Sequence, residues 1–375
     1  MTDLRRRYVE RIRRDGAPLS PQLSEAFASV PRELFVTEGF QRRDGTWARP
    51  GSAGFLERVY SNDVLVTKVD GGVPVSSSSQ PSLMAIMLAA LAVQPGDRVL
   101  EIGAGTGYNA ALLTALGARV TTVDVQDDVV ARARAALQRA GVEGVRVVAG
   151  DGYAGVPNEH FDRVIVTVGV AGLSPHWLAQ AESPRPGPIV VPVEHAGTHP
   201  VLAVHCAASG SDVAGPGVVT GRVVCSSGFM TAAGPLTARH PGAHPHPVPA
   251  TALTAFRPAA PSRWEHSLDS LAYRDLWYAA GVWSTRATHA AVPGRDGSTL
   301  ILLDEEGTGG AAILPDGMVL AGGAQEREYA AAAAGIVDRW EAASRPPMQA
   351  WRITLARTGD SATPIWCPTA WDLVD

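Results

Sequence analysis

The stretch VLEIGAGTGYNAALL, residues 99–113, decides the fold. It joins a short apolar run to a loop with glycine at alternate positions, and an alanine- and leucine-rich run follows at once. Glycine lets the backbone turn tightly and approach a ligand closely, and the first turn of a helix offers free N–H groups. The stretch therefore predicts a strand, a ligand-binding loop and a helix, in that order.

The residues on either side continue this alternation. Strand patterns stand at 98–103, 118–125, 145–150, 161–170 and 187–194, with helical patterns at 82–93, 107–117 and 126–141 between them. This order predicts an α/β fold, a Rossmann-like doubly wound sheet covered by helices on both faces. Shorter strand patterns at 200–208 and 218–234 indicate an antiparallel edge.

Composition and charge narrow the function classes. The chain has 375 residues, of which 46% are hydrophobic and 18% charged, as in a globular protein. A net charge of −5 offers no basic excess for a phosphate backbone, so we expect no nucleic-acid partner. The arginine-rich segment 4–14 spreads its charges around a helix, which indicates a solvated helix.

The cysteines and the apolar runs bear on the cellular compartment. Cys206, Cys225 and Cys367 have neither zinc-site spacing nor the pattern of a disulfide framework. The first residues are charged and lack the apolar core of a signal peptide, and the longest apolar run, 83–93, is too short to cross a bilayer. We expect a cytoplasmic protein that binds no metal and no membrane. The sequence does not indicate its oligomeric state.

A proline-rich segment divides the chain. Residues 235–262 contain the run RHPGAHPHPVP, and proline fits neither a helix interior nor a central strand. We interpret this segment as a linker, and His240, His244 and His246 as its polar residues rather than metal ligands. It would separate a catalytic domain, 1–234, from a C-terminal α+β domain, 263–375, which holds seven of the nine tryptophans.

Acidic residues follow the strands of the predicted sheet. Glu101 precedes the glycines, Asp124 ends the next strand 21 residues after Gly103, and Asp151 follows the third. Ligands of such sheets bind at the carboxyl ends of the strands, where Asp124 can accept hydrogen bonds from ribose hydroxyls. The GxGxG spacing and Glu101 favour S-adenosylmethionine over a dinucleotide.

Further motifs carry a resemblance to a known family: VPRELFV (30–36), SQPSLMA (79–85), GDGYAG (150–155), FDRVIVT (161–167) and VVPV (190–193). Their order and spacing over about residues 5–234 resemble protein-L-isoaspartate O-methyltransferases. The resemblance implies a class I methyltransferase that uses S-adenosylmethionine and releases S-adenosylhomocysteine. The matching serine of the Ser-x-Pro motif, Ser79, is the expected catalytic residue. The residues expected to bind the cofactor are Ser77, Glu101, Gly103, Gly105, Gly107, Asp124, Val125, Asp151 and Gly152.

The chain also departs from the family pattern. Phe35 and Tyr60 are 25 residues apart, the segment from Tyr60 to Ser79 is long, and Ser78 replaces a usually apolar residue. With the C-terminal domain, these insertions resemble long homologues that tailor ribosomally made lanthipeptides and graspetides. That resemblance implies methylation of an aspartate in a cyclised precursor peptide, followed by closure to an aspartimide that persists or hydrolyses to isoaspartate.

Other functions stay open. Repair of isoaspartyl residues in proteins is the nearest alternative, and we expect truncation after Gly234 to spare a repair enzyme but to abolish a tailoring enzyme. A small-molecule O-methyltransferase is a second alternative, and a non-catalytic peptide-binding module is a third. In the C-terminal domain, we expect a helix near 268–280, a hairpin turning at 315–317, and a role in recognising the peptide.

Overall fold

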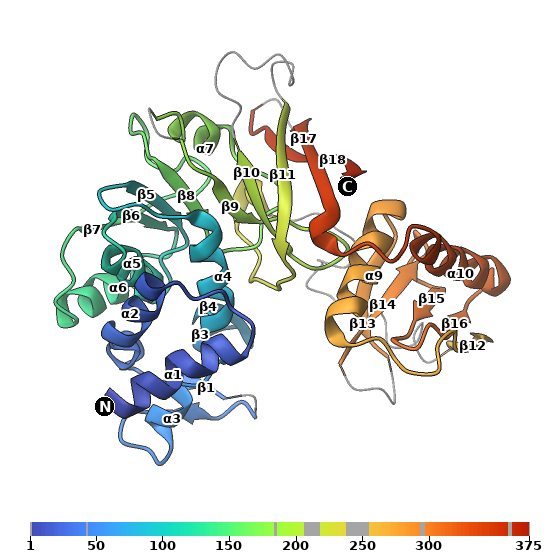
Figure 1. Ribbon diagram of the computed structural model, residues 1–375, viewed down its shortest axis with the longest axis horizontal. Coiled ribbons are helices and arrows are strands. Elements are labelled where there is room, and N and C mark those ends of the chain that lie inside the picture. The colour runs from blue at the N-terminus through green and yellow to red at the C-terminus, as the bar shows by residue number, and fades with distance from the viewer. Residues whose placement is uncertain are drawn as a thin grey trace.

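The computed structural model describes residues 2–42, 44–183, 186–205, 218–237, 255–292, 297–358 and 362–374. These residues form a nine-stranded sheet flanked by helices, a small four-stranded sheet, and a five-stranded sheet with helices of its own (Figure 1). His240, His244 and His246 lie outside the described residues.

The nine-stranded sheet, in the order β18-β17-β11-β10-β9-β8-β5-β6-β7, is the centre of the protein. Its parallel half consists of β5 (Arg98–Ile102), β6 (Arg119–Asp124), β7 (Val145–Ala149), β8 (Arg163–Val166) and β9 (Ile189–Pro192). Its antiparallel half consists of β10 (Val201–His205), β11 (Val218–Cys225), β17 (Trp351–Thr358) and β18 (Ile365–Leu373). The predicted α/β class and the parallel sheet are confirmed.

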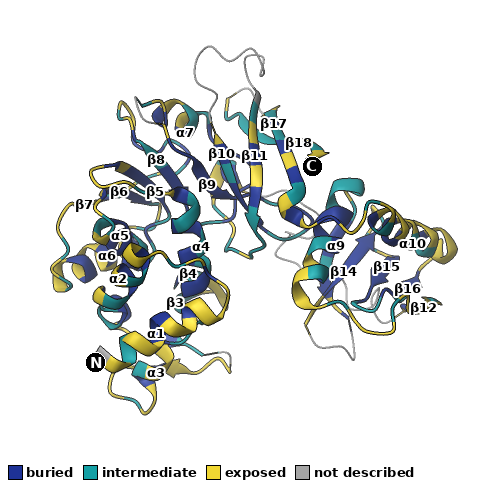
Figure 2. Cartoon of the chain, in the orientation of Figure 1, coloured by how far each residue is buried: buried dark blue, intermediate teal, exposed yellow. Residues whose placement is uncertain are grey.

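Both faces of this sheet are covered. Successive side chains of a strand point to opposite faces, so Val164 and Val166 of β8 pack in one hydrophobic cluster and Ile165 packs in the other. The cluster around Ile165 takes its partners from the helices α1 (Thr2–Arg14), α2 (Pro21–Ser29), α4 (Pro81–Leu91), α5 (Tyr108–Ala115) and α6 (Asp127–Arg139). The opposite cluster includes Trp177 of α7 (Pro175–Gln180), and the strands between these layers are buried (Figure 2).

The long segments before Ser79 are built into a separate small sheet. Its strands are β1 (Phe40–Gln41), β2 (Trp47–Ala48), β3 (Leu65–Asp70) and β4 (Val73–Ser78), in the order β2-β1-β3-β4, and the short helices η1 (Arg32–Phe35) and α3 (Phe55–Val59) lie in the same part of the chain. The serine run thus belongs mainly to a strand that leads directly into α4.

The C-terminal unit has an antiparallel sheet of its own, in the order β12-β16-β15-β14-β13. Its elements are β12 (Arg257–Ala260), α9 (Ser270–Trp283), β13 (Ala287–Ala291), β14 (Ser298–Leu303), β15 (Gly310–Ile313), β16 (Val319–Gly322) and α10 (Glu326–Ala342). The helix expected near 268–280 is present as α9, and the hairpin expected at 315–317 joins β15 to β16.

The predicted boundaries of this unit are wrong at both ends. Within the predicted linker, β12 pairs with β16 and so belongs to the five-stranded sheet, and η2 (Gly234–Leu236) lies at the linker's start. At the other end, β17 and β18 leave the unit and extend the nine-stranded sheet beside β11 (Figure 1). Strand periodicity does not show which sheet edge a strand joins, because an edge can pair with any strand that reaches it.

The strand pattern at 218–234 extends beyond the strand that the structure shows there. β11 ends at Cys225, and the next residues form no continuous strand pairing. Thr231 makes a single β-bridge with Gly169. This segment borders the candidate site described below.

The C-terminal unit docks through α9 onto the turn between β9 and β10. Trp277 Nε1 donates a hydrogen bond of 3.0 Å to the carbonyl oxygen of Ala196. The ring of His195 lies 4.3 Å from that of Tyr278, and its Nε2 is 2.8 Å from the Tyr278 carbonyl oxygen. Side chains of the main sheet and of the unit share one hydrophobic cluster, so α9 packs against the main sheet.

Candidate functional site

The glycine loop begins where β5 ends. Gly103 has φ +98°, and a Cβ there would lie 2.5 Å from Thr167 Oγ1, which itself donates to the Gly103 carbonyl oxygen at 2.7 Å. Gly105 has φ +50°, and a Cβ there would lie 3.1 Å from the carbonyl oxygen of Ser77. Both positions therefore require glycine, and the loop passes close beneath the serine run.

The carboxyl ends of the neighbouring strands complete the cofactor half of the site. Asp124 Oδ2 accepts a hydrogen bond of 3.1 Å from the Gly105 N–H, and burial raises the pKa of this carboxyl. Val125 is 60% exposed and lines a cavity next to the glycine loop, as do Asp151 and Gly152. An acidic acceptor beside an exposed apolar side chain suits a ribose and an adenine ring.

Glu101 and Gly107 do not line this cavity. Glu101 is fully buried beneath the loop, and its Oε1 accepts a hydrogen bond of 2.7 Å from Asn109 Nδ2. Removal from water raises the pKa of Glu101 to about 7. Gly107, with φ +82°, is the N-cap of α5. The structure thus places both residues in the support of the loop, and their predicted contact with the cofactor stays a prediction.

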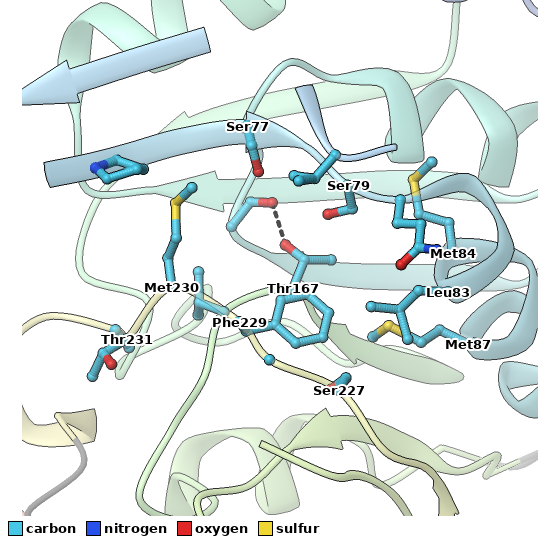
Figure 3. A pocket seen from close by; sticks show the side chains of 18 of the residues that line it. Ser77, Ser79, Leu83, Met84, Met87, Thr167, Ser227, Phe229, Met230 and Thr231 are labelled. Atoms are coloured by element: carbon cyan, nitrogen blue, oxygen red, sulfur yellow. Dashed lines mark hydrogen bonds between the residues drawn. The ribbon is translucent and has the colours of Figure 1, made fainter. Parts of the chain in front are cut away.

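Ser77 and Ser79 face the cavity, as Figure 3 shows. Side chains alternate along β4, so Ser77 and Ser79 are partly exposed while Ser76 and Ser78 are buried, although all four border the cavity. Ser79 directly precedes Gln80, the N-cap of α4, which fixes its place between strand and helix. The expected catalytic residue, Ser79, and the expected cofactor-binding residue, Ser77, are therefore brought together beside the glycine loop.

Arg32 supports the serine run from behind. It lies in η1, is 0% exposed, and makes six hydrogen bonds, all to neutral oxygen atoms. Its guanidinium donates to the carbonyl oxygens of Ser78 and Ser79 at 3.3 and 2.9 Å and to Ser78 Oγ at 3.3 Å. Its remaining acceptors are the carbonyl oxygens of Val59, Ser61 and Asp63. Arg32 therefore fixes the backbone that carries Ser79.

Arg32 lies in the motif VPRELFV, but the sequence analysis did not predict it as a functional residue. A signal was present, because an arginine among apolar residues is buried only where many acceptors surround it. Its contact with Ser78 Oγ also gives a role to the serine that departs from the family pattern.

One cavity of about 1710 Å³ contains all these exposed groups. Its apolar wall opposite the serines includes Phe229 and Met230 from the segment after β11, with Leu83 and Met87 of α4 beside them (Figure 3). Thr167, at the end of β8, lies between the two sides (Figure 3). The cavity then continues to α9 of the C-terminal unit.

Comparison with known proteins identifies the family. The family model for protein-L-isoaspartate(D-aspartate) O-methyltransferase matches residues 4–213, more than half of the chain. The chain belongs to this family. The class I methyltransferase fold inferred from the glycine loop is thereby confirmed.

Curated relatives of the same name match part of the chain. A protein-L-isoaspartate O-methyltransferase of Thermotoga maritima is 37% identical over 179 residues, which cover 47% of this chain and 51% of the relative. One of Methanoculleus marisnigri is 40% identical over 143 residues, covering 38% of this chain and 56% of the relative. The chain thus spans about half the length of these curated relatives.

A solved structure extends the likeness to the whole chain. It is a protein-L-isoaspartate O-methyltransferase with 25% sequence identity and a TM-score of 0.53, covering 98% of this chain and 99% of its own. The C-terminal unit therefore has a counterpart in a protein with that name. Its presence does not separate a tailoring enzyme from an isoaspartate methyltransferase.

S-adenosylmethionine is the methyl donor of this family, and the residues present fit it. The Gly105 backbone leaves room that a side chain would fill, while Asp124 and Val125 border the cavity with an acceptor and an apolar surface. Within the described ranges, no group of three or more His, Cys, Asp or Glu side chains could hold a metal ion. No described helix combines the length and apolar character needed to cross a membrane.

Proposed function

We propose that this chain is an S-adenosylmethionine-dependent carboxyl O-methyltransferase that acts on isoaspartyl residues of proteins and peptides, in the cytoplasm. The observation that carries the proposal is the pair Ser77 and Ser79 on the cavity face of β4, directly above the glycine loop. Membership of the family and the relatives named above support the same activity.

Methyl transfer requires the protein mainly to position the two reactants. The cofactor, when bound, supplies a sulfonium methyl group that a carboxylate oxygen takes in line, leaving S-adenosylhomocysteine. A carboxylate is already ionised at neutral pH, so no side chain has to remove a proton. Ser79 donates its hydroxyl hydrogen to the oxygen of the substrate carboxylate that does not attack, and thereby orients the attacking oxygen.

The apolar wall assists in a second way. The reaction joins an anion to a cation and gives neutral products, so charge disappears as the transition state forms. Phe229, Met230 and Leu83 keep water from this part of the cavity, where separated charges are less well solvated than in bulk water. We expect this wall to favour the transition state over the charged reactants.

Matched linear peptides that differ only in isoaspartate or aspartate test the proposal, with methyl transfer from S-adenosylmethionine as the readout. We expect labelling of the isoaspartyl peptide. Ser79→Ala should lower turnover about a hundredfold, the scale of losing one donor to a reacting oxygen, with unchanged affinity for S-adenosylhomocysteine. Ser29→Ala, at an exposed position of α2 outside the cavity, is the matched control. Equal labelling of both peptides, or a wild-type rate in Ser79→Ala, would contradict the proposal.

Methylation of an aspartate in a cyclised precursor peptide remains a separate hypothesis, together with its aspartimide product. No observation favours it over isoaspartate, because a solved isoaspartate methyltransferase matches the full length. If neither linear peptide is labelled while S-adenosylhomocysteine binds, cyclised peptides become the substrates to test.

A further inference from the structure

The cavity is larger than a cofactor site and reaches the C-terminal unit. Pockets for small molecules usually measure about 300–1,000 Å³, and this one measures about 1710 Å³. Leu271, Arg274, Trp277 and Tyr278 of α9 line its far part. Leu271 is 67% exposed although it is apolar, so this part of the wall is open to a ligand.

The charges on the cavity wall are unevenly distributed. Arg274 is the one arginine or lysine among its described lining residues, whereas the carboxylates Asp15, Asp70, Asp124 and Asp151 line other parts of it. Arg274 Nη1 donates a hydrogen bond of 3.0 Å to Ser226 Oγ. In the part of the chain that the structure describes, no carboxylate lies within ion-pair distance of this guanidinium. The guanidinium has donors to spare, because it carries five N–H groups.

Arg274 is tied to the wall that faces Ser79. Its partner Ser226 is next to Ser227, which lies on the same side of the cavity as Phe229 and Met230 in Figure 3. A substrate held between this wall and Ser79 therefore extends naturally toward α9. The helix is a firm support, because Trp277 and Tyr278 contact the turn between β9 and β10, and Asp275 Oδ1 accepts from the Met348 N–H at 2.9 Å.

We propose that Arg274 anchors a second carboxylate of the substrate, distinct from the one that is methylated. The enzyme then prefers isoaspartyl peptides that carry an acidic side chain or a free C-terminal carboxylate close to the isoaspartate. This inference rests on the proposed function. Arginine suits the role because its planar guanidinium can form paired hydrogen bonds with a carboxylate.

Steady-state kinetics with paired peptides test the anchor. One pair carries Glu or Gln next to the isoaspartate, and a second pair ends in a free or an amidated C-terminus, so the source of the carboxylate is identified. In the wild type we expect kcat/KM to be about fivefold higher for the anionic member of at least one pair, between the effect of an exposed ion pair and that of a paired arginine–carboxylate contact. The difference should lie in KM and should shrink at high salt.

Variants separate anchoring from a structural role. Arg274→Gln should abolish the preference, and Arg274→Lys should retain part of it. Arg327→Gln removes the same charge from an exposed position of α10 outside the cavity, so it should leave the preference unchanged. If Arg274 only held Ser226 in place, Arg274→Gln would slow both members of a pair equally, and that result would overturn the proposal. Equal rates for both pairs in the wild type would overturn it too.

A peptide-binding assay tests the role of Arg274 even if the enzyme methylates none of the peptides. Fluorescence anisotropy with labelled peptides and enzyme loaded with S-adenosylhomocysteine compares the same pairs. A lack of methylation of any isoaspartyl peptide would refute the proposed function, and the anchor is then judged by affinity. Equal affinity of the wild type for both members of each pair would refute it, whereas a preference lost in Arg274→Gln would support it.

Discussion

Replacing Arg32 by methionine tests whether the buried guanidinium holds the serine run in place. Methionine fills a similar volume but donates no hydrogen bond. The change leaves five backbone carbonyl oxygens and Ser78 Oγ without this donor. A buried acceptor without a partner costs about 1–3 kcal/mol. Because three of these hydrogen bonds are only partly buried, we expect a total loss of about 4 kcal/mol, similar to breaking a buried ion pair.

Urea unfolding followed by circular dichroism measures the stability change. A loss of this size is a large share of the usual 5–15 kcal/mol of a folded protein, so the midpoint should fall clearly. Arg32→Lys keeps the charge and up to three donors, and should therefore lose about half as much. Arg58→Met, at an exposed position of α3 next to Val59, is the matched control and should change stability by less than about 0.5 kcal/mol.

Catalysis gives the second readout. Arg32 contacts Ser78 and Ser79, and none of its six hydrogen bonds within the described part of the chain reaches the glycine loop or Asp124, so cofactor affinity should stay close to the wild-type value. A displaced Ser79 should lower kcat by up to a hundredfold, since small misplacements in an active site have effects of that order. Wild-type stability together with wild-type kcat in Arg32→Met would refute the reasoning. A parallel loss of kcat and cofactor affinity would show that Arg32 supports the whole fold rather than Ser79.

Three further predictions follow from the same structure. Asp124→Asn should weaken S-adenosylhomocysteine binding about tenfold, since an amide replaces an acceptor that also receives the Gly105 N–H; calorimetric titration measures this, and unchanged affinity would place the ribose elsewhere. Glu101→Gln should raise stability by about 2 kcal/mol at pH 8 and by little at pH 4, because a folded-state pKa of about 7, above the usual value of 4.5, means that ionisation destabilises the fold progressively between these two values. Urea unfolding at both pH values checks this prediction, and a constant difference would contradict it. Truncation after Gly234 should give aggregated protein in size-exclusion chromatography, because β11 loses its partner β17; a folded monomer would contradict the sheet order.

The sequence predicted those parts of the site that depend on local geometry. The glycine loop and Asp124 are readable because the turn, the helix start and the strand end are set by neighbouring residues. Ser79 was found through resemblance rather than physics, because nothing in a run of serines tells which hydroxyl faces a cavity. The alternation of β4 decides that point, and it depends on the pairing of β4 with β3.

Contacts between distant segments could not be predicted in this way. Arg32 reaches carbonyl oxygens that lie between 27 and 47 residues away in the chain, so no local pattern marks its partners. The wall formed by α9 depends on how two units dock, which sequence periodicity does not encode. Because the C-terminal strands complete the main sheet, we now expect truncation after Gly234 to harm a repair enzyme as well.

The segment that follows β11 explains why the C-terminal unit contributes to the site. β11 is held on one side by β10 and on the other by β17, and the residues that follow it form the apolar wall of the cavity. Moving β17 would therefore move Phe229 and Met230 as well as Arg274, whose partner Ser226 lies in the same segment. A solved relative matches 98% of the chain at 25% identity, so its fold includes a counterpart of the C-terminal unit. This likeness agrees with a C-terminal unit that is built into the site through β17 and α9.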